Sequence, residues 1–142
     1  MYLQDWAGEV AATSANRLYK HIKHNLTFET YLSINNKSLR IAISKVRLSS
    51  HLFNIERGRW GHRKLPIENR ICSHCNVIED EYHCLIVCPR YVNERKGCVP
   101  EYLLIRPSMF AFIKYLKSEC ETEYRKLGLL CMRVMKEHRV YI

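Results

Sequence analysis

The spacing of apolar residues predicts helices along most of the chain. Apolar side chains recur at steps of three and four residues, which gathers them on one face of an α-helix. On this basis we expect long helices over residues 4–23, 37–48 and 121–139. The last helix should bury Tyr124, Leu127, Leu130, Cys131 and either Val134 or Met135.

The helix that begins at Lys37 separates apolar from basic side chains. Its apolar face holds Leu39, Ala42, Ile43 and Val46, and this face is flanked by Arg40, Lys45 and Arg47. The pattern predicts a helix that packs on one side and is basic on its outer side.

Glycine and proline divide the middle of the chain into shorter pieces. Gly58 is expected to take the left-handed conformation and so to end one or two helical turns over residues 52–58. Residues 59–69, which include Pro66, then form a loop. Trp60 in this loop has two interpretations, as a residue of the core, which is the commoner role, or as a platform on which a base stacks.

A hairpin, a buried helix, a short helix over residues 91–96 and a capped helix are expected beyond this loop. Residues 71–77 predict the hairpin, and the acidic residues 79–81 suit the positive end of the next helix, which should be buried by Leu85, Ile86 and Val87. Ser108 is a good N-cap. The helix that follows it has Phe110, Ile113 and Leu116 at three-residue steps, with Phe112 alongside.

Four residues within this middle region have the spacing of a zinc site. Cys72, Cys75, His83 and Cys88 form a Cys-x2-Cys-x7-His-x4-Cys array. Three thiolates and one imidazole are a common closed set of ligands for a structural Zn²⁺. Two residues between the first two cysteines allow one tight turn to aim both sulfurs at the same point. The array therefore predicts one structural zinc ion and no open position for a hydrolytic water.

The last two ligands can meet only if the helix that carries them is interrupted. His83 and Cys88 are five residues apart, which on a regular α-helix separates them by about 140°. The helix must therefore begin at His83 or break before Cys88, and Pro89 makes the break plausible. Some of the cysteines could instead be small buried apolar residues. His74, Cys84 and Cys98 are possible substitute ligands.

Composition places the chain among small folded intracellular proteins. Its 142 residues are enough for one domain, or for a helical part joined to a small metal-bearing part, and 47% of them are hydrophobic. Seven cysteines, an odd number, with zinc spacing and no apolar signal segment indicate reduced thiols in the nucleus or cytoplasm. Apolar runs are far shorter than the ~18–20 residues that span a bilayer, so we expect no membrane partner.

Positive charge is concentrated just before the array. Residues 17–70 hold twelve Lys and Arg against three Glu, a net charge of +9 that equals the charge of the whole chain. Such a segment is expected of a protein that binds RNA or DNA, chiefly through phosphates, although a solvated basic face is about as common. The candidate nucleic-acid-binding residues are Arg40, Arg47, Arg57, Arg59, Trp60, Arg63, Lys64 and Arg70.

Several short segments resemble the C-terminal zinc-knuckle region of LINE-type (non-LTR) retrotransposon reverse transcriptases. They are Arg47-Leu48-Ser49-Ser50-His51, Ile55-Glu56-Arg57-Gly58-Arg59, Asn69-Arg70-Ile71-Cys72, Glu79-Asp80-Glu81-Tyr82-His83 and Val87-Cys88-Pro89-Arg90-Tyr91, and residues 108–116 resemble the closing helices of that family. The resemblance covers residues 38–139. It implies that Cys72, Cys75, His83 and Cys88 are the zinc ligands and that the region supports the RNA template or target DNA during target-primed reverse transcription.

The chain lacks the carboxylates that the catalytic domains of that family require. It has only two aspartates, Asp5 and Asp80, and no Tyr-x-Asp-Asp segment, whereas metal-dependent polymerases and nucleases use clustered carboxylates to hold Mg²⁺. We therefore expect no enzymatic activity, and either the tail of a larger polyprotein or an isolated remnant. An enzyme that uses His51 or His62 as a base is disfavoured because neither has a nearby nucleophile and carboxylate pattern.

Taken together, the sequence predicts a mainly α-helical small domain in which zinc holds a knuckle made of a hairpin and a helix. Its expected divisions are an N-terminal helical segment (1–35), a basic helix and loop (36–70), the zinc knuckle (71–91) and C-terminal helices (92–142). The alternative function is a zinc-stabilised protein-interaction module whose basic face binds an acidic partner. A RING-type ubiquitin ligase is disfavoured because it needs eight ligands in two sites.

Overall fold

The computed structural model describes residues 18, 22, 30–60 and 64–142. Apart from Leu18 and Ile22, which are buried, the predicted helix over residues 4–23 lies outside the described residues. The described part is mainly helical, as predicted, and contains no strand, only an isolated antiparallel bridge between Ile71 and Ile78. Among these residues, no helix is long and apolar enough to cross a membrane.

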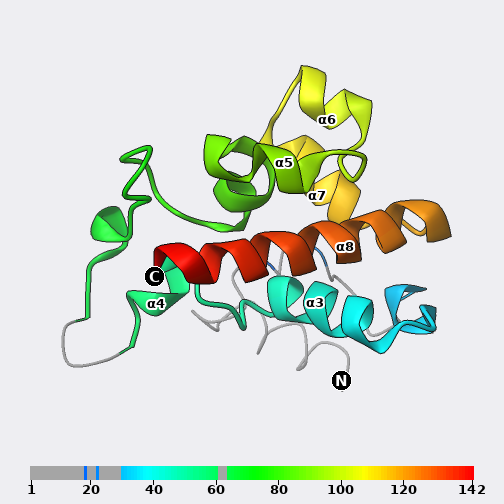
Figure 1. Ribbon diagram of the computed structural model, residues 1–142, viewed down its shortest axis with the longest axis horizontal. Coiled ribbons are helices and arrows are strands. Elements are labelled where there is room, and N and C mark those ends of the chain that lie inside the picture. Colours follow the sequence, from blue (N-terminus) through cyan, green and yellow to red (C-terminus); the bar gives the residue numbers. More distant parts are fainter. Residues whose placement is uncertain (1–17, 19–21, 23–29, 61–63) are drawn as a thin grey trace, which may run out of the picture.

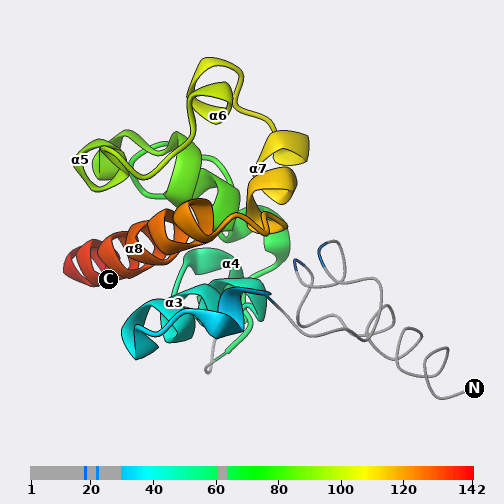
Figure 2. The ribbon, with the colours of Figure 1, turned by 90° about the vertical axis from the view of Figure 1, so that its right-hand side faces the viewer.

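Two long helices form the centre of the fold. Helix α3 (Lys37–Arg47) and helix α8 (Glu121–His138) run side by side in the same direction (Figures 1 and 2). Gly128 permits their close approach, because a Cβ atom at this position would lie 2.9 Å from Leu39 Cβ and 3.2 Å from Leu39 O. The predicted buried face of α8 is confirmed, with Val134 fully buried and Met135 only partly buried.

Helix α3 is defined by a cap at each end. The Asn36 side chain accepts a hydrogen bond from Leu39 N (3.3 Å) at the start. At the other end Ser49 takes a left-handed conformation (φ 56°), Ser49 N donates to Val46 O (3.2 Å) and Ser50 N donates to Lys45 O (2.7 Å). This pair of bonds is the Schellman motif, which turns the chain sharply out of the helix toward His51.

The apolar face of α3 is as predicted, but its basic side chains are not all on the outside. Leu39, Ala42, Ile43 and Val46 are buried. The prediction that Arg47 faces outward is wrong: Arg47 is 4% exposed and its Nη1 donates to Leu116 O (2.7 Å). A long side chain beside the apolar face can reach across to a carbonyl at the end of another helix, and the spacing alone does not reveal this partner.

Helix α4 (Asn54–Arg57) ends at Gly58, although not by the predicted route. Gly58 has φ −66°, so the left-handed conformation is wrong. A larger residue does not fit at this position, because a Cβ atom would lie 2.4 Å from Arg70 Cγ. Arg70 crosses this point to donate to Ile55 O (3.0 Å) and Leu65 O (2.9 Å), and thereby fixes the start of the loop that follows.

Short helical turns make up the next part of the chain. They are η2 (Ile67–Asn69), η3 (His83–Val87), η4 (Pro89–Tyr91), α5 (Val92–Arg95) and α6 (Glu101–Ile105). Leu85 and Ile86 are buried as expected, but Val87 is exposed because the helix widens and ends there. Helix α6 was not predicted. Its five residues are too few to show a helical period.

Helix α7 (Met109–Leu116) packs against α8 and completes the core. Ser108 Oγ accepts from Ala111 N (3.0 Å), which confirms the predicted N-cap. The prediction of its buried face is wrong in part: Phe112, Tyr115 and Leu116 are buried, but Phe110 is 84% exposed. Short 3₁₀ turns η1 (Thr30–Ser33) and η5 (Arg139–Tyr141) precede α3 and follow α8.

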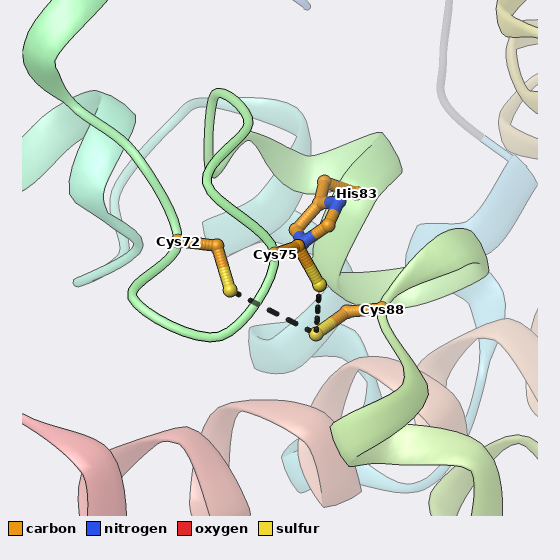
Figure 3. Close-up of side chains that lie close together, drawn as sticks. All are labelled: Cys72, Cys75, His83 and Cys88. Atoms are coloured by element: carbon orange, nitrogen blue, oxygen red, sulfur yellow. Dashed lines mark hydrogen bonds between the residues drawn. The ribbon is translucent and has the colours of Figure 1, made fainter.

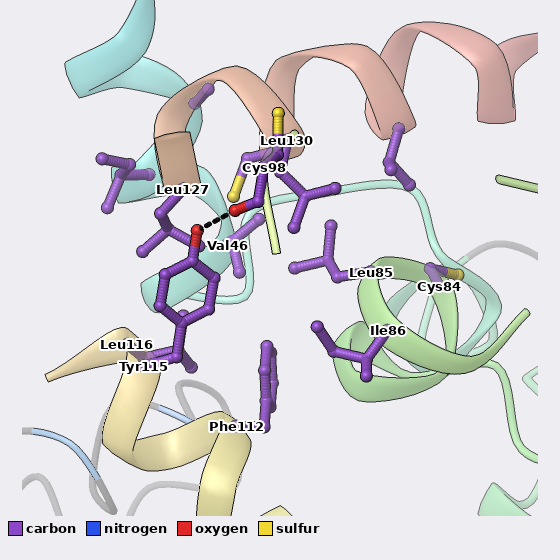
Figure 4. Close-up of a cluster of buried hydrophobic side chains, with 14 of the residues drawn as sticks. Val46, Cys84, Leu85, Ile86, Cys98, Phe112, Tyr115, Leu116, Leu127 and Leu130 are labelled. Atoms are coloured by element: carbon purple, nitrogen blue, oxygen red, sulfur yellow. Dashed lines mark hydrogen bonds between the residues drawn. The ribbon is translucent and has the colours of Figure 1, made fainter. Parts of the chain in front are cut away.

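One hydrophobic core joins the two central helices to the segment that contains η3. Side chains from η3, α7, α3 and α8 meet in it, including Leu85, Phe112, Val46 and Leu130 (Figure 4). Tyr115 Oη donates to Cys98 O (2.6 Å) inside this cluster, which satisfies the hydroxyl. The middle segment is therefore packed directly against α8 and is not an appended module.

Candidate metal centre

The four residues of the Cys-Cys-His-Cys array converge on one point. Their possible ligand atoms all lie within 4.8 Å of one another. Cys88 Sγ is 3.9 Å from Cys72 Sγ and 3.8 Å from Cys75 Sγ (Figure 3). In a tetrahedral site with zinc–sulfur bonds of about 2.3 Å, sulfur atoms lie about 3.8 Å apart. The spacing of the thiols therefore matches the edges of such a tetrahedron.

A tight turn supplies the first two ligands. Cys72 N donates to Val77 O (2.8 Å), and Asn76 N donates back to Cys72 O (2.8 Å). Asn76 is left-handed (φ 57°), a conformation that asparagine tolerates better than most residues. The bridge between Ile71 and Ile78 closes the loop, and so the predicted hairpin is reduced to a single bridged turn.

A π-helical turn brings His83 and Cys88 together. η3 spans His83–Val87, and Cys88 N donates to His83 O across five residues (2.7 Å). Cys88 itself is extended (φ −61°, ψ 124°), so the helix both widens and stops before this ligand. This is the interruption that the five-residue spacing requires. Asp80 Oδ1 accepts from His83 N (2.8 Å) and fixes the start of the turn.

A buried arginine holds the same turn from the other side. Arg95 donates from Nε to Leu85 O (2.8 Å) and from Nη2 to Cys84 O (3.1 Å). A π-turn leaves carbonyls without their usual α-helical partners. Arg95, which is 8% exposed, provides these donors. The guanidinium therefore acts as a structural support for the ligand-bearing turn.

The four side chains suit a cation. Cys72 and Cys88 are fully buried and His83 is 4% exposed. Burial lowers the pKa of the His83 imidazole and so favours the neutral form that binds metals, and within the described part its Nε2 has no hydrogen-bond partner. Burial also raises the pKa of the Cys75 thiol, and that of Cys88 to about 12. A divalent cation would stabilise these groups as thiolates.

The three alternative ligands do not join this cluster. His74 is exposed between the first two cysteines, Cys84 is fully buried among apolar side chains, and Cys98 lies beside Tyr115 and receives a hydrogen bond from Arg133 Nη1 (3.5 Å). Within the described residues, the one group of three or more possible ligands is the predicted set.

Two buried carboxylate–histidine pairs adjoin the centre, and the sequence did not reveal them. Glu81 Oε1 lies 2.6 Å from His51 Nε2, and Glu79 Oε1 lies 2.7 Å from His138 Nε2. Phe53 N donates to His51 Nδ1 (3.2 Å), so His51 carries its proton on Nε2 and donates it to Glu81. These pairs tie the acidic residues before η3 to the ends of α3 and α8.

The predicted nucleic-acid-binding residues are placed in different ways. Arg57, Trp60 and Lys64 are exposed, and Arg59 is partly exposed and pairs with Glu56 (3.0 Å). The guanidinium groups of Arg40, Arg47 and Arg70 donate to main-chain carbonyls, that of Arg40 to Ile34 O. Arg63 lies outside the described residues. Trp60 is 68% exposed, so its expected place in the core is wrong.

Comparisons with protein-family models, with curated proteins and with solved structures found no match to this chain. The resemblance to LINE-type reverse transcriptases therefore stays a prediction that rests on the residues named above. What the structure adds to the sequence is a mainly helical domain with a Cys3His cluster that could hold a metal ion.

Proposed function

We propose that the Cys3His cluster binds one zinc ion whose role is structural. The observation that carries this proposal is the convergence of three sulfurs and a buried imidazole within 4.8 Å, with Cys88 Sγ at tetrahedral spacing from the other two sulfurs. With four protein ligands the coordination shell is closed, so the ion has no position at which to activate water. Its contribution is to hold the turn of Cys72 and Cys75 against the π-turn of His83 and Cys88.

Zinc content of purified variants tests this assignment. The wild-type chain should carry one zinc ion, and Cys72→Ser should lose it because serine is a poor zinc ligand. Cys84→Ser is the matched control, since Cys84 is buried next to a ligand but outside the cluster. An unchanged zinc content in Cys72→Ser, or a metal-free wild-type protein, would contradict the assignment.

We propose further that the domain binds RNA or DNA, chiefly through phosphates, and catalyses no reaction. Support comes from the +9 charge of residues 17–70 and from the exposed Arg57, Lys64 and Trp60. Arg59 lies over the Trp60 ring, 5.3 Å from its centroid, so a cation and a π-face are presented together. This is the mixture that single-strand binding proteins use, and it agrees with an accessory region of a LINE-type reverse transcriptase.

Salt-dependent titration tests nucleic-acid binding. The Arg57→Ala/Lys64→Ala variant should bind single strands more weakly and lower the salt slope by about 0.7 for each phosphate that the protein no longer neutralises. Both side chains are exposed, so the fold should be kept. Lys96→Ala/Lys117→Ala removes two exposed charges elsewhere and serves as the control. Equal affinity and equal slope in all three proteins would contradict the proposal.

A protein-interaction module is the second candidate, and one surface favours it. Apolar side chains of α6 and α7 are exposed next to one another, among them Ile105 (68%) and Phe110 (84%). Exposed apolar patches often mark protein interfaces. Failure of all nucleic-acid titrations, together with a loss of self-association or partner binding in Phe110→Ser, would favour this function instead.

A further inference from the structure

A pocket of about 430 Å³ lies where the ends of α3 and α8 meet α4. This volume is within the range of small-molecule sites. The pocket is away from the metal ligands, and neither Cys72, Cys75, His83 nor Cys88 lines it. The described residues that line it include four aromatic or imidazole rings and three basic side chains.

The floor of the pocket is made of ring systems that are fixed in place. His51 and Phe53 lie with centroids 4.5 Å apart, and Phe53 meets His138 edge-on at 5.0 Å. Both nitrogens of His51 are engaged, by Phe53 N and by Glu81, and His138 Nε2 is engaged by Glu79. The rings of the floor are therefore fixed and almost fully buried, Trp60 is the exposed ring among the described lining residues, and His51 has no free nitrogen to act as a base.

Trp60 forms a wall, and cations stand around the opening. The Trp60 side chain is 68% exposed although tryptophan is usually well buried. Arg59 covers one side of the Trp60 ring and forms an ion pair with Glu56. Glu56 is the acidic residue among the described lining residues, and the ion pair offsets its charge. Lys45 and Arg139 are exposed and line the same pocket.

A second hollow continues the pocket along the outer face of α3. It shares Lys45, Leu48 and Ser50 with the first and adds Lys37 and Arg40. None of the described residues that line it is acidic. The two hollows thus form one path that is apolar at its base and positive along its edges, a surface complementary to a chain that carries flat bases and regularly spaced anions.

We propose that the pocket binds one unpaired base of a single-stranded nucleic acid. The base stacks on Trp60 above the ring floor, its phosphate lies on Lys45 and Arg139, and the strand continues along α3 past Lys37. This inference rests on the proposed nucleic-acid binding and adds to it a requirement for a free base. A duplex can still contact the cations, but its bases are stacked and paired and cannot enter.

Titration with two ligands of equal charge tests the proposal. One ligand is a short single-stranded oligonucleotide, and the other has the same length with abasic nucleotides throughout. Wild type should bind the first about 5- to 150-fold more tightly, the range expected for stacking of one base on an aromatic ring. Trp60→Ala should remove this ratio, whereas Trp60→Phe, which keeps a π-face, should restore part of it.

Further variants separate the base site from general phosphate binding. Ser50→Tyr should fill the pocket from its exposed edge and remove the ratio while leaving the salt slope unchanged. Lys45→Ala should weaken the binding of both ligands and lower the salt slope by about 0.7. Lys117→Ala removes an exposed charge outside the pocket and should change neither the affinities nor the salt slope.

The outcomes distinguish this inference from the function on which it rests. Equal binding of normal and abasic strands by wild type, or a ratio that survives in both Trp60→Ala and Ser50→Tyr, would overturn the base site and leave phosphate binding intact. No binding of either ligand would overturn both proposals.

Discussion

At the residue scale, the metal ligands could be predicted because coordination chemistry connects their sequence spacing to their geometry. Two residues between Cys72 and Cys75 permit one turn, and the five-residue step from His83 to Cys88 requires an interrupted helix. The structure supplies that interruption as a π-turn. The partners of His51 and His138 could not be predicted from the sequence. Glu81 is 30 residues from His51 and Glu79 is 59 residues from His138, and no local sequence pattern indicates such pairs.

Glu79 makes the stability of the domain depend on pH. Burial by itself would raise the pKa of this carboxyl, but hydrogen bonds from His138 and from Asn54 N (2.9 Å) outweigh it and lower the pKa below its usual value. The folded state therefore binds this proton less readily than the unfolded chain. The stability that Glu79 contributes is present above its unfolded pKa and is lost as the pH falls through its folded pKa.

We expect Glu79→Gln to lower the free energy of unfolding by about 1–3 kcal/mol at neutral pH, the cost of losing a charged acceptor in a buried site. The deficit should shrink between neutral pH and an acidic pH below the ordinary pKa of glutamate, because the wild-type carboxyl also becomes protonated as the pH falls through its lowered folded pKa. Urea unfolding at both pH values measures this difference. Glu119→Gln, at an exposed position, is the control. A deficit that stays constant with pH would show that Glu79 acts by shape alone.

Arg95 should be needed for the ligand-bearing turn. Arg95→Met keeps the apolar stem but removes the donors to Leu85 O and Cys84 O, which leaves two buried carbonyls without these bonds. We expect a loss of about 1–3 kcal/mol in thermal or urea unfolding and weaker zinc retention against a chelator. Lys96→Met, the exposed neighbouring position, should have little effect. Equal zinc retention in both variants would remove Arg95 from the support of the centre.

At the scale of elements, periodicity located the helices better than it located their faces. Helices α3, α7 and α8 begin within a residue or two of the expected positions, because apolar steps are local signals and α3 and α7 also have a capping side chain at the start. Phe110 and Val87 were assigned to buried faces and are exposed. Neighbouring positions such as Phe110 and Phe112 are both apolar, and which one is buried depends on the packing of α7 against the rest of the fold.

Gly128 shows how one residue sets the distance between two elements. Alanine has a higher helix propensity than glycine by about 1 kcal/mol, so Gly128→Ala would stabilise an isolated helix. In this fold its Cβ would lie 2.9 Å from Leu39 Cβ and 3.3 Å from Ile43 Cδ1. Because α3 would have to move, we expect a net loss of about 1–2 kcal/mol.

Urea unfolding of Gly128→Ala beside Lys126→Ala, an exposed site on the same helix, measures this loss. A Gly128→Ala protein more stable than wild type would show that α3 and α8 can separate without cost.

At the scale of the whole molecule, the sequence predicted the parts but not how they join. The expected divisions at residues 36–70, 71–91 and 92–142 describe the chain as consecutive units, and they remain predictions. In space, Leu85 packs with Phe112 and Leu130, and the two carboxylate–histidine pairs connect the ligand-bearing segment to the ends of α3 and α8. Such long-range contacts depend on tertiary packing, which a periodic pattern does not encode.

The pocket beside Trp60 arises from the same long-range packing. Its lining residues come from the ends of α3 and α8, from α4 and the segments on either side of it, and from the start of η5. Residues of its floor are held by Glu79 and Glu81, which lie just before the metal-bearing turn. We therefore expect loss of the metal to affect the pocket through these two carboxylates, although the pocket contains no ligand.

Hydrogen exchange before and after chelation tests most directly whether one metal ion holds residues 71–91 together. The segment shares its core with α8, but the metal would join its two ligand-bearing turns and would add folding free energy there. Removal of zinc should therefore abolish protection of Cys72 N and Cys88 N, which close the two ligand-bearing turns, while amides in the interior of α3 and α8 remain protected longer. Full protection of Cys72 N and Cys88 N in zinc-free protein, or equal loss of protection throughout the domain, would contradict the account.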